Sequence, residues 1–157
     1  MQDQFGRKIE YLRLSVTDRC NLRCRYCMPE SGVADLTHGD VLRYEEMLRV
    51  AAAACRLGIR NIRVTGGEPL VRRGIVDFIG RLARLPEKPE ITLTTNGLLL
   101  AELAEELKAA GLSRVNISLD TLRPERFEEL TRRPGLDNVL AGIKAAERVG
   151  MLPIKLN

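Results

Sequence analysis

The sequence lacks a long apolar run, a tract of one charge and an obvious set of paired cysteines. No apolar stretch approaches the ~20 residues needed to cross a bilayer, and residues 1–10 are polar, without the apolar core of a signal peptide. We therefore expect a cytoplasmic protein that does not bind membranes. The net charge is only +4, and basic and acidic side chains are interspersed, which argues against nucleic-acid binding and favours a charged small-molecule ligand.

Cysteine and histidine are scarce, with four cysteines and one histidine in the chain. Cys20, Cys24 and Cys27 lie within eight residues of one another, a spacing that favours a metal site in a reducing compartment over a disulfide framework. Cys55 lies on the apolar stripe of an expected helix and is predicted to be a small core residue. His38 lies among glycine and aspartate neighbours and is predicted to be a solvated loop residue.

Short strand-like runs alternate with amphipathic helical runs along the chain. This order predicts one α/β domain over residues 1–157, with a parallel sheet and helical crossovers. The expected strands are 11–16, 61–65, 90–95, 114–119 and 151–157. The expected helices are 44–57, 74–85, 100–110 and 137–149, with a short extra helix near 124–130.

Within each expected strand, apolar and polar residues alternate. In the second strand, for example, Ile62 and Val64 face away from Arg63 and Thr65. A sheet covered by helices on both faces would have nearly continuous apolar strands, so this alternation predicts that helices cover one face only. The polar face would then line a chamber, as in an open part-barrel, and a Rossmann sheet is disfavoured.

The clustered cysteines form a CxxxCxxC motif directly after the first expected strand, in the loop where parallel α/β folds place their active sites. Three thiolates can hold three irons of a four-iron cubane and leave the fourth iron open to another ligand. Structural zinc sites, by contrast, normally have four protein ligands. The alternatives are a zinc site completed by His38 or Cys55, and three thiols that bind no metal.

Two motifs resemble those of the radical S-adenosylmethionine (SAM) superfamily. CxxxCxxC with Tyr26 directly before its third cysteine resembles the signature loop, and GGEP at 66–69 resembles the SAM-binding motif. Taken alone, GGEP would be an ordinary turn before a helix. Glycines let backbone groups approach the methionyl amino group of SAM closely, and Glu68 can stabilise that cation. The resemblance implies a [4Fe–4S] cluster on Cys20, Cys24 and Cys27, and a SAM site that includes Tyr26, Gly66, Gly67, Glu68 and Ser118.

A wider set of segments resembles one family of this superfamily, the GTP 3′,8-cyclases that begin molybdenum cofactor biosynthesis. The segments are LRLSVTDRCN at 12–21, YCMP at 26–29, RVTGGEPL at 63–70, LTTNG at 93–97 and NISLD at 116–120. The resemblance runs from about Gly6 to Asn157 and implies a TIM-like (β/α)6 part-barrel, of which this chain would end within the fifth strand. It also implies a second three-cysteine cluster and a Gly-Gly tail beyond Asn157, so we expect a fragment that is insufficient for full activity and has an exposed strand edge.

Cations occupy the polar face of three expected strands, at Arg13, Arg63 and Lys155. Together they suit a polyphosphate, because burying three positive side chains without an anion would be costly. The alternative is that an unfinished barrel exposes them to water. In the cyclase family, the positions that match Arg13, Arg63, Thr94 and Lys155 bind GTP.

The resemblance also implies a reaction. The reduced cluster cleaves SAM to methionine and a 5′-deoxyadenosyl radical, which removes the C3′ hydrogen of GTP, and the sugar radical then attacks C8 of guanine. This chemistry needs an external one-electron reductant, and its product, 3′,8-cyclo-7,8-dihydro-GTP, goes on to a cyclic pyranopterin synthase. We assign no residue as general acid or base, since the cofactors supply the chemistry. Three other hypotheses remain open: another radical SAM reaction, a non-catalytic iron–sulfur or zinc module, and a truncation product that folds poorly.

Overall fold

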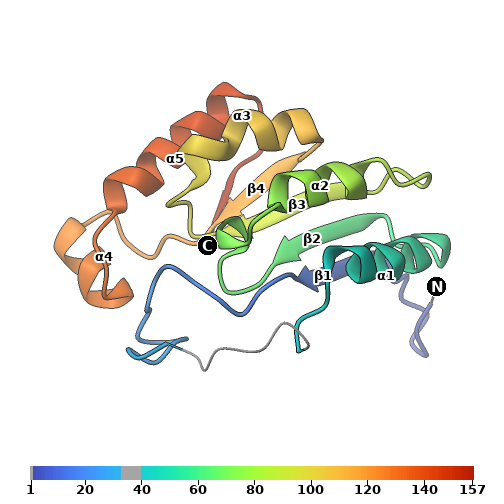
Figure 1. Cartoon of the computed structure of the whole chain (residues 1–157), viewed down its shortest axis with the longest axis horizontal. Coiled ribbons are helices and arrows are strands. Elements are labelled where there is room, and N and C mark those ends of the chain that lie inside the picture. The colour runs from blue at the N-terminus through green and yellow to red at the C-terminus, as the bar shows by residue number, and fades with distance from the viewer. Residues whose placement is uncertain (1, 33–39) are drawn as a thin grey trace.

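The computed structural model describes residues 2–32 and 40–157, in which five parallel strands form one sheet in the order β1-β2-β3-β4-β5 (Figure 1). The strands are β1 (Tyr11–Ser15), β2 (Asn61–Thr65), β3 (Glu90–Thr95), β4 (Arg114–Ile117) and β5 (Lys155–Leu156). The helices are α1 (Tyr44–Arg56), the 3-10 helix η1 (Pro69–Val71), α2 (Ile75–Ala83), α3 (Leu100–Ala110), α4 (Pro124–Thr131) and α5 (Leu136–Arg148). The predicted alternation of strands and helices is confirmed, but β4 and β5 are shorter than predicted, and Ser118 lies just beyond the end of β4. His38 lies outside the described residues.

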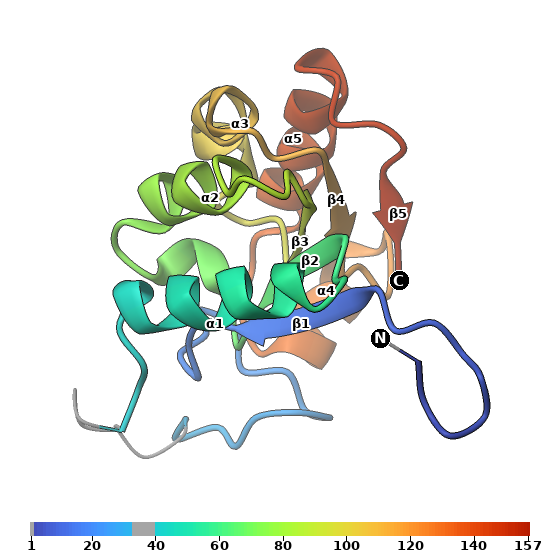
Figure 2. The same cartoon turned by 90° about the vertical axis from the view of Figure 1, so that its right-hand side faces the viewer.

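One face of the sheet carries the hydrophobic core. In Figures 1 and 2, α1, α2, α3 and α5 lie along this face of the curved sheet. Ile62 and Val64 of β2 are fully buried, and they belong to the same core cluster as Phe78 of α2 and Leu107 of α3. Full burial of an aliphatic side chain of this size contributes about 1.5–3 kcal/mol. This packing explains why the helices cover the side of the sheet to which the apolar side chains of the strands point.

The opposite side of the sheet, hereafter the polar face, carries side chains that the strand register aligns in two rows. The row nearer the amino ends of the strands contains the register partners Arg13, Arg63, Thr92 and Arg114. The next row contains Thr94, Asn116 and Lys155. The predicted one-sided alternation is therefore confirmed, and the cations Arg13, Arg63 and Lys155 of β1, β2 and β5 share this face with Arg114 of β4.

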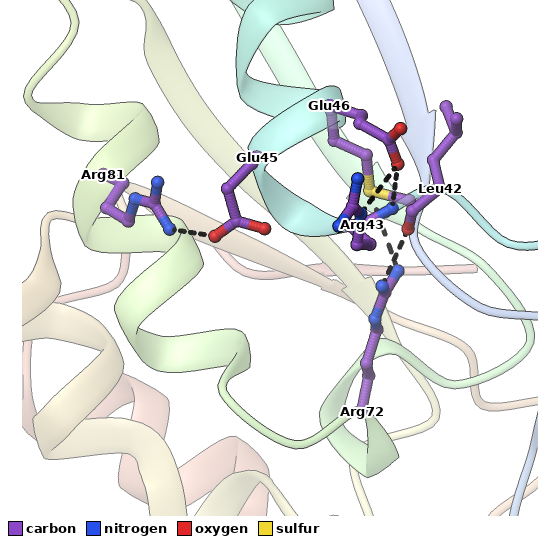
Figure 3. Close-up of polar contacts among 7 residues, drawn as sticks. Leu42, Arg43, Glu45, Glu46, Arg72 and Arg81 are labelled. Atoms are coloured by element: carbon purple, nitrogen blue, oxygen red, sulfur yellow. Dashed lines mark hydrogen bonds and ion pairs between the residues drawn. The ribbon is translucent and has the colours of Figure 1, made fainter. Parts of the chain in front are cut away.

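Arg72, which follows η1, connects the end of β1 to the start of α1, and Figure 3 shows its contact with Leu42. Its guanidinium donates hydrogen bonds to the carbonyl of Val16 and, at 2.8 Å, to that of Leu42, and it lies 4.1 Å from the ring centroid of Tyr44. Figure 3 also shows Arg81 of α2 bonded to Glu45 of α1 at 2.9 Å. Arg72 therefore holds the residue after β1 close to the start of α1, and Arg81 links α2 to α1.

Among the described helices, none is both long and apolar enough to span a membrane.

Candidate functional site

The predicted cofactor-binding segments all follow the carboxyl ends of strands. The cysteine loop follows β1, GGEP follows β2, and Ser118 follows β4. Because all five strands are parallel, these segments meet at one edge of the sheet, the left-hand edge in Figure 1. The fold therefore brings together segments that lie up to about a hundred residues apart in the sequence.

The GGEP loop packs directly against the start of the cysteine loop. The amide of Gly67 donates to the carbonyl of Thr17 at 2.7 Å, and the amide of Glu68 donates to that of Arg19 at 2.8 Å. A Cβ added at Gly66 would lie 2.4 Å from the carbonyl oxygen of Thr17, and one at Gly67 would lie 2.4 Å from that of Arg19. The glycines were predicted to make room for SAM; the structure adds that the chain's own backbone requires them.

Glu68 is a buried carboxylate, only 1% exposed, that joins the end of β2 to the end of β3. Its Oε1 accepts hydrogen bonds from the amide of Leu70 at 3.0 Å and the hydroxyl of Thr95 at 2.8 Å, and its Oε2 accepts from the amide of Asn96 at 2.7 Å. Burial raises the pKa of Glu68, although these hydrogen bonds oppose the shift. A carboxylate offers about four lone-pair sites, so Glu68 keeps capacity for a cationic ligand.

The three cysteines of the motif differ in exposure. Cys24 is buried, Cys20 is partly buried and Cys27 is exposed. Burial is the main cause that raises the pKa of Cys20 and Cys24. The charges of Glu68 and Cys27 raise the pKa of Cys20 further, and those of Cys27 and Cys20 raise the pKa of Cys24 further. The sulfur of Cys20 also accepts from the amide of Leu22 at 3.4 Å. A positively charged metal centre would offset this cost of ionising neighbouring thiols.

The three thiols meet the requirement of the predicted cluster but not that of a single metal ion. Among the described residues, no three ligating side chains converge on a position for one metal ion. A cubane has a different requirement, because each thiolate binds a different iron. Three thiols in one loop, each within electrostatic reach of the others, fit that requirement. Cys55 is 2% exposed within the core cluster, as predicted.

The sequence did not reveal that the end of α4 holds the cysteine loop. The amide of Arg23 donates to the carbonyl of Thr131 at 3.0 Å. The guanidinium of Arg132 donates to the carbonyls of Arg23 at 3.0 Å and Met28 at 3.3 Å. Arg132 adopts a left-handed backbone conformation with φ of 55°, which is unfavourable for a residue other than glycine. No local sequence signal reports contacts between residues more than a hundred positions apart.

Replacing Arg132 with glycine is expected to loosen the cysteine loop without a large loss of global stability. Glycine adopts the left-handed backbone conformation readily, which offsets part of the cost of losing two hydrogen bonds from a charged donor. Each such hydrogen bond contributes about 1.5–3 kcal/mol. Hydrogen exchange should become faster at the amides of Arg23 and Met28. Lys88→Gly is the matched control, because Lys88 also has a positive φ, 47°, but is not part of the cysteine loop. Unchanged exchange in Arg132→Gly would show that the guanidinium does not hold the loop.

Tyr26 and Ser118 lie at the same strand-end edge as the cysteine loop. The Tyr26 hydroxyl donates to the carboxylate of Asp120 at 2.8 Å, which connects the cysteine loop to the segment after β4. Burial and the hydrogen bond to Asp120 raise the pKa of Tyr26, so the phenol stays protonated at neutral pH. Ser118 is exposed.

The predicted substrate-binding residues lie on the polar face. Arg13 and Arg63 are register partners on β1 and β2, and the guanidinium of Arg63 lies 5.2 Å from the ring centroid of Tyr11. Thr94 and Lys155 lie in the adjacent row. Arg13 and Lys155 are exposed, and Arg63 is partly buried. The structure thus places all four predicted residues on one face, within the strands whose carboxyl ends form the edge that carries the cysteine loop.

Comparison with known proteins gives three results. The family model of the Radical SAM superfamily matches residues 14–157. A GTP 3′,8-cyclase of Peptoclostridium acidaminophilum is 61% identical over 155 residues, which cover 99% of this chain and 48% of that protein. A GTP 3′,8-cyclase of Geobacter sulfurreducens is 57% identical over 155 residues, with the same coverage of 99% and 48%.

The crystal structure of methylornithine synthase is similar in fold, with a TM-score of 0.75 at 14% identity, covering 97% of this chain and 45% of that chain. The predicted α/β part-barrel is therefore confirmed. The chain spans about half the length of the curated relatives it matches.

Proposed function

We infer the function from the family, since the chain belongs to the radical SAM superfamily. Membership implies a [4Fe–4S] cluster and SAM as its cofactors. We propose that the chain is the cluster- and SAM-binding part of a GTP 3′,8-cyclase. The observation that carries this proposal is the similarity to GTP 3′,8-cyclases over almost the whole chain, far beyond the two cofactor motifs.

In this proposal, the strand-end edge binds the cofactors. Cys20, Cys24 and Cys27 hold the cluster, and Glu68 accepts a hydrogen bond from the methionyl ammonium group of SAM with its remaining lone pair. Gly66 and Gly67 keep the SAM-binding loop against the cysteine loop, while Tyr26 and Ser118 contact SAM. When bound, the two cofactors supply the radical that removes the C3′ hydrogen of GTP, after reduction by an external donor.

The polar face binds GTP in the same proposal. Arg13, Arg63 and Lys155 hold the triphosphate through charge-assisted hydrogen bonds, and Thr94 adds a hydroxyl. Arg13 and Arg63 precede the carboxyl ends of their strands. The phosphates therefore lie nearer the amino ends of the strands than the cofactors do, and the ribose points toward the strand-end edge. This orientation is the chain's contribution to positioning C3′.

The product, 3′,8-cyclo-7,8-dihydro-GTP, would then be consumed by a cyclic pyranopterin synthase in molybdenum cofactor biosynthesis. Residues 1–157 would form one domain that acts in the cytoplasm.

Binding of GTP to the purified chain tests this proposal. We expect equilibrium dialysis to show GTP binding that Arg63→Gln weakens by roughly tenfold or more, because a charge-assisted hydrogen bond contributes about 1.5–3 kcal/mol. Arg56→Gln removes the same charge from exposed Arg56 of α1, on the helical side of the sheet, and should leave GTP affinity unchanged. A radical SAM protein with another substrate would bind SAM but show no GTP affinity that depends on Arg63.

A further inference from the structure

Three buried polar atoms of the polar face have no hydrogen-bond partner within the described parts of the chain. They are Nε of Arg63, Oγ1 of Thr92 and Nδ2 of Asn116. Thr92 and Asn116 are each only 2% exposed. Buried polar groups in folded proteins are nearly always paired, and an unpaired one is unfavourable. The other two unpartnered atoms, on Tyr44 and Glu87, lie outside this face.

The strand register places these three atoms among the predicted phosphate-binding residues. Thr92 is the register partner of Arg63 on the neighbouring strand. Asn116 is the register partner of Thr94 on one side and of Lys155 on the other. Neighbouring strands lie about 4.8 Å apart. One ligand can therefore contact the Arg63–Thr92 pair and the Asn116–Lys155 pair together.

The chemistry of the unpaired atoms selects the kind of ligand. The guanidinium nitrogen of Arg63 and the amide nitrogen of Asn116 only donate hydrogen bonds, and the hydroxyl of Thr92 can donate as well. The missing partner must therefore supply several acceptor oxygens close together, which is a property of a polyphosphate. Arg114 shows the contrast, because its guanidinium is already bonded to Glu90 of β3 at 2.9 Å.

We propose that Thr92 and Asn116 are further substrate-positioning residues, whose hydroxyl and amide donate hydrogen bonds to phosphate oxygens of the nucleotide that Arg63 and Lys155 bind. This inference rests on the proposed function and adds to it two residues that the sequence motifs did not indicate. In the ligand-free chain the two side chains are paired poorly; the bound triphosphate completes their hydrogen bonds. Stability without ligand is thereby exchanged for affinity.

Thr92→Val separates this role from a structural one. Valine has nearly the same shape but no hydroxyl, so it removes an unpaired polar atom. We expect the midpoint of thermal unfolding of the ligand-free chain to rise by about 2–4 °C, while affinity for GTP and for inorganic tripolyphosphate falls about tenfold. Thr92→Ser retains the hydroxyl and should retain affinity. Asn116→Leu should behave like Thr92→Val, and Asn116→Asp should weaken binding further through charge repulsion.

Thr131→Val is the matched stability control. Thr131 is also buried, at 4% exposed, but its hydroxyl lies 2.8 Å from the carbonyls of both Phe127 and Arg133. Its replacement should lower the unfolding midpoint. A fall of the midpoint in Thr92→Val and Asn116→Leu as well would assign Thr92 and Asn116 a structural role and overturn the inference.

The binding titrations distinguish failure of this inference from failure of the proposed function. If the unmodified chain binds GTP and tripolyphosphate, and the Thr92 and Asn116 variants bind them equally well, the inference fails and the proposed function stands. If the unmodified chain binds neither compound, both fail together. Should Thr92→Val not fold, the Asn116 pair decides the question alone.

Discussion

Replacing Cys24 with alanine is expected to abolish the iron–sulfur cluster of the anaerobically reconstituted chain. Cys24 is the buried member of the motif, and its carbonyl also accepts hydrogen bonds from the amides of Cys27 and Met28 at 3.1 and 3.0 Å. Alanine keeps that backbone turn and removes only the thiolate. Two thiolates then remain for a cubane that needs three in this loop. The reduced variant should lack the electron paramagnetic resonance signal that the unmodified chain shows and that SAM perturbs.

Cys55→Ala is the matched control for this experiment. Cys55 lies on the buried side of α1 and is 2% exposed within the core, where it packs as a small apolar side chain. We expect the variant to keep the cluster signal and its response to SAM. Loss of the signal in Cys55→Ala, or a SAM-sensitive signal that persists in Cys24→Ala, would contradict the assignment of ligands. A chain that binds zinc but no iron would favour the zinc module.

The order of strands and helices, and the coverage of one face of the sheet by the helices, could be predicted because both depend on local sequence patterns. Alternation within β2, for example, requires only that Ile62 and Val64 be apolar and Arg63 polar. The strand-end position of the cofactor motifs followed from the same reasoning, since parallel strands share one carboxyl edge. The prediction made β5 too long, and the cause of its shortness is local. Pro153 has no amide hydrogen to donate to the ladder, and pairing begins only at Lys155.

The contacts that position the site could not be predicted in the same way. Arg132 reaches the cysteine loop across 109 residues, and Tyr26 reaches Asp120 across 94. Such contacts depend on where the chain returns in space. The burial of Thr92 is also a property of its neighbours, because its strand pattern predicted only a polar side chain facing a chamber.

Gly67→Ala is expected to have the other large effect. The added Cβ would lie 2.4 Å from the carbonyl oxygen of Arg19 and 2.6 Å from that of Asp18. Both are backbone atoms, so no side chain can rotate away, and the GGEP loop has to move from the cysteine loop. That movement breaks the hydrogen bonds from Gly67 to Thr17 and from Glu68 to Arg19. We expect a loss of about 2–4 kcal/mol in the free energy of unfolding, measured by urea denaturation.

The same substitution should also separate SAM binding from cluster binding. All three cysteines remain in Gly67→Ala, so the reconstituted variant should keep a cluster signal, but displacement of Glu68 should remove the response of that signal to SAM. Gly80→Ala is the control, because the nearest atoms to its added Cβ belong to the flexible side chain of Arg84, at 3.3 Å, within helix α2. Alanine is favoured there by about 1 kcal/mol, so stability should rise. If Gly67→Ala unfolds at the same urea concentration as the unmodified chain and still responds to SAM, the contact between the two loops does not position the cofactor site.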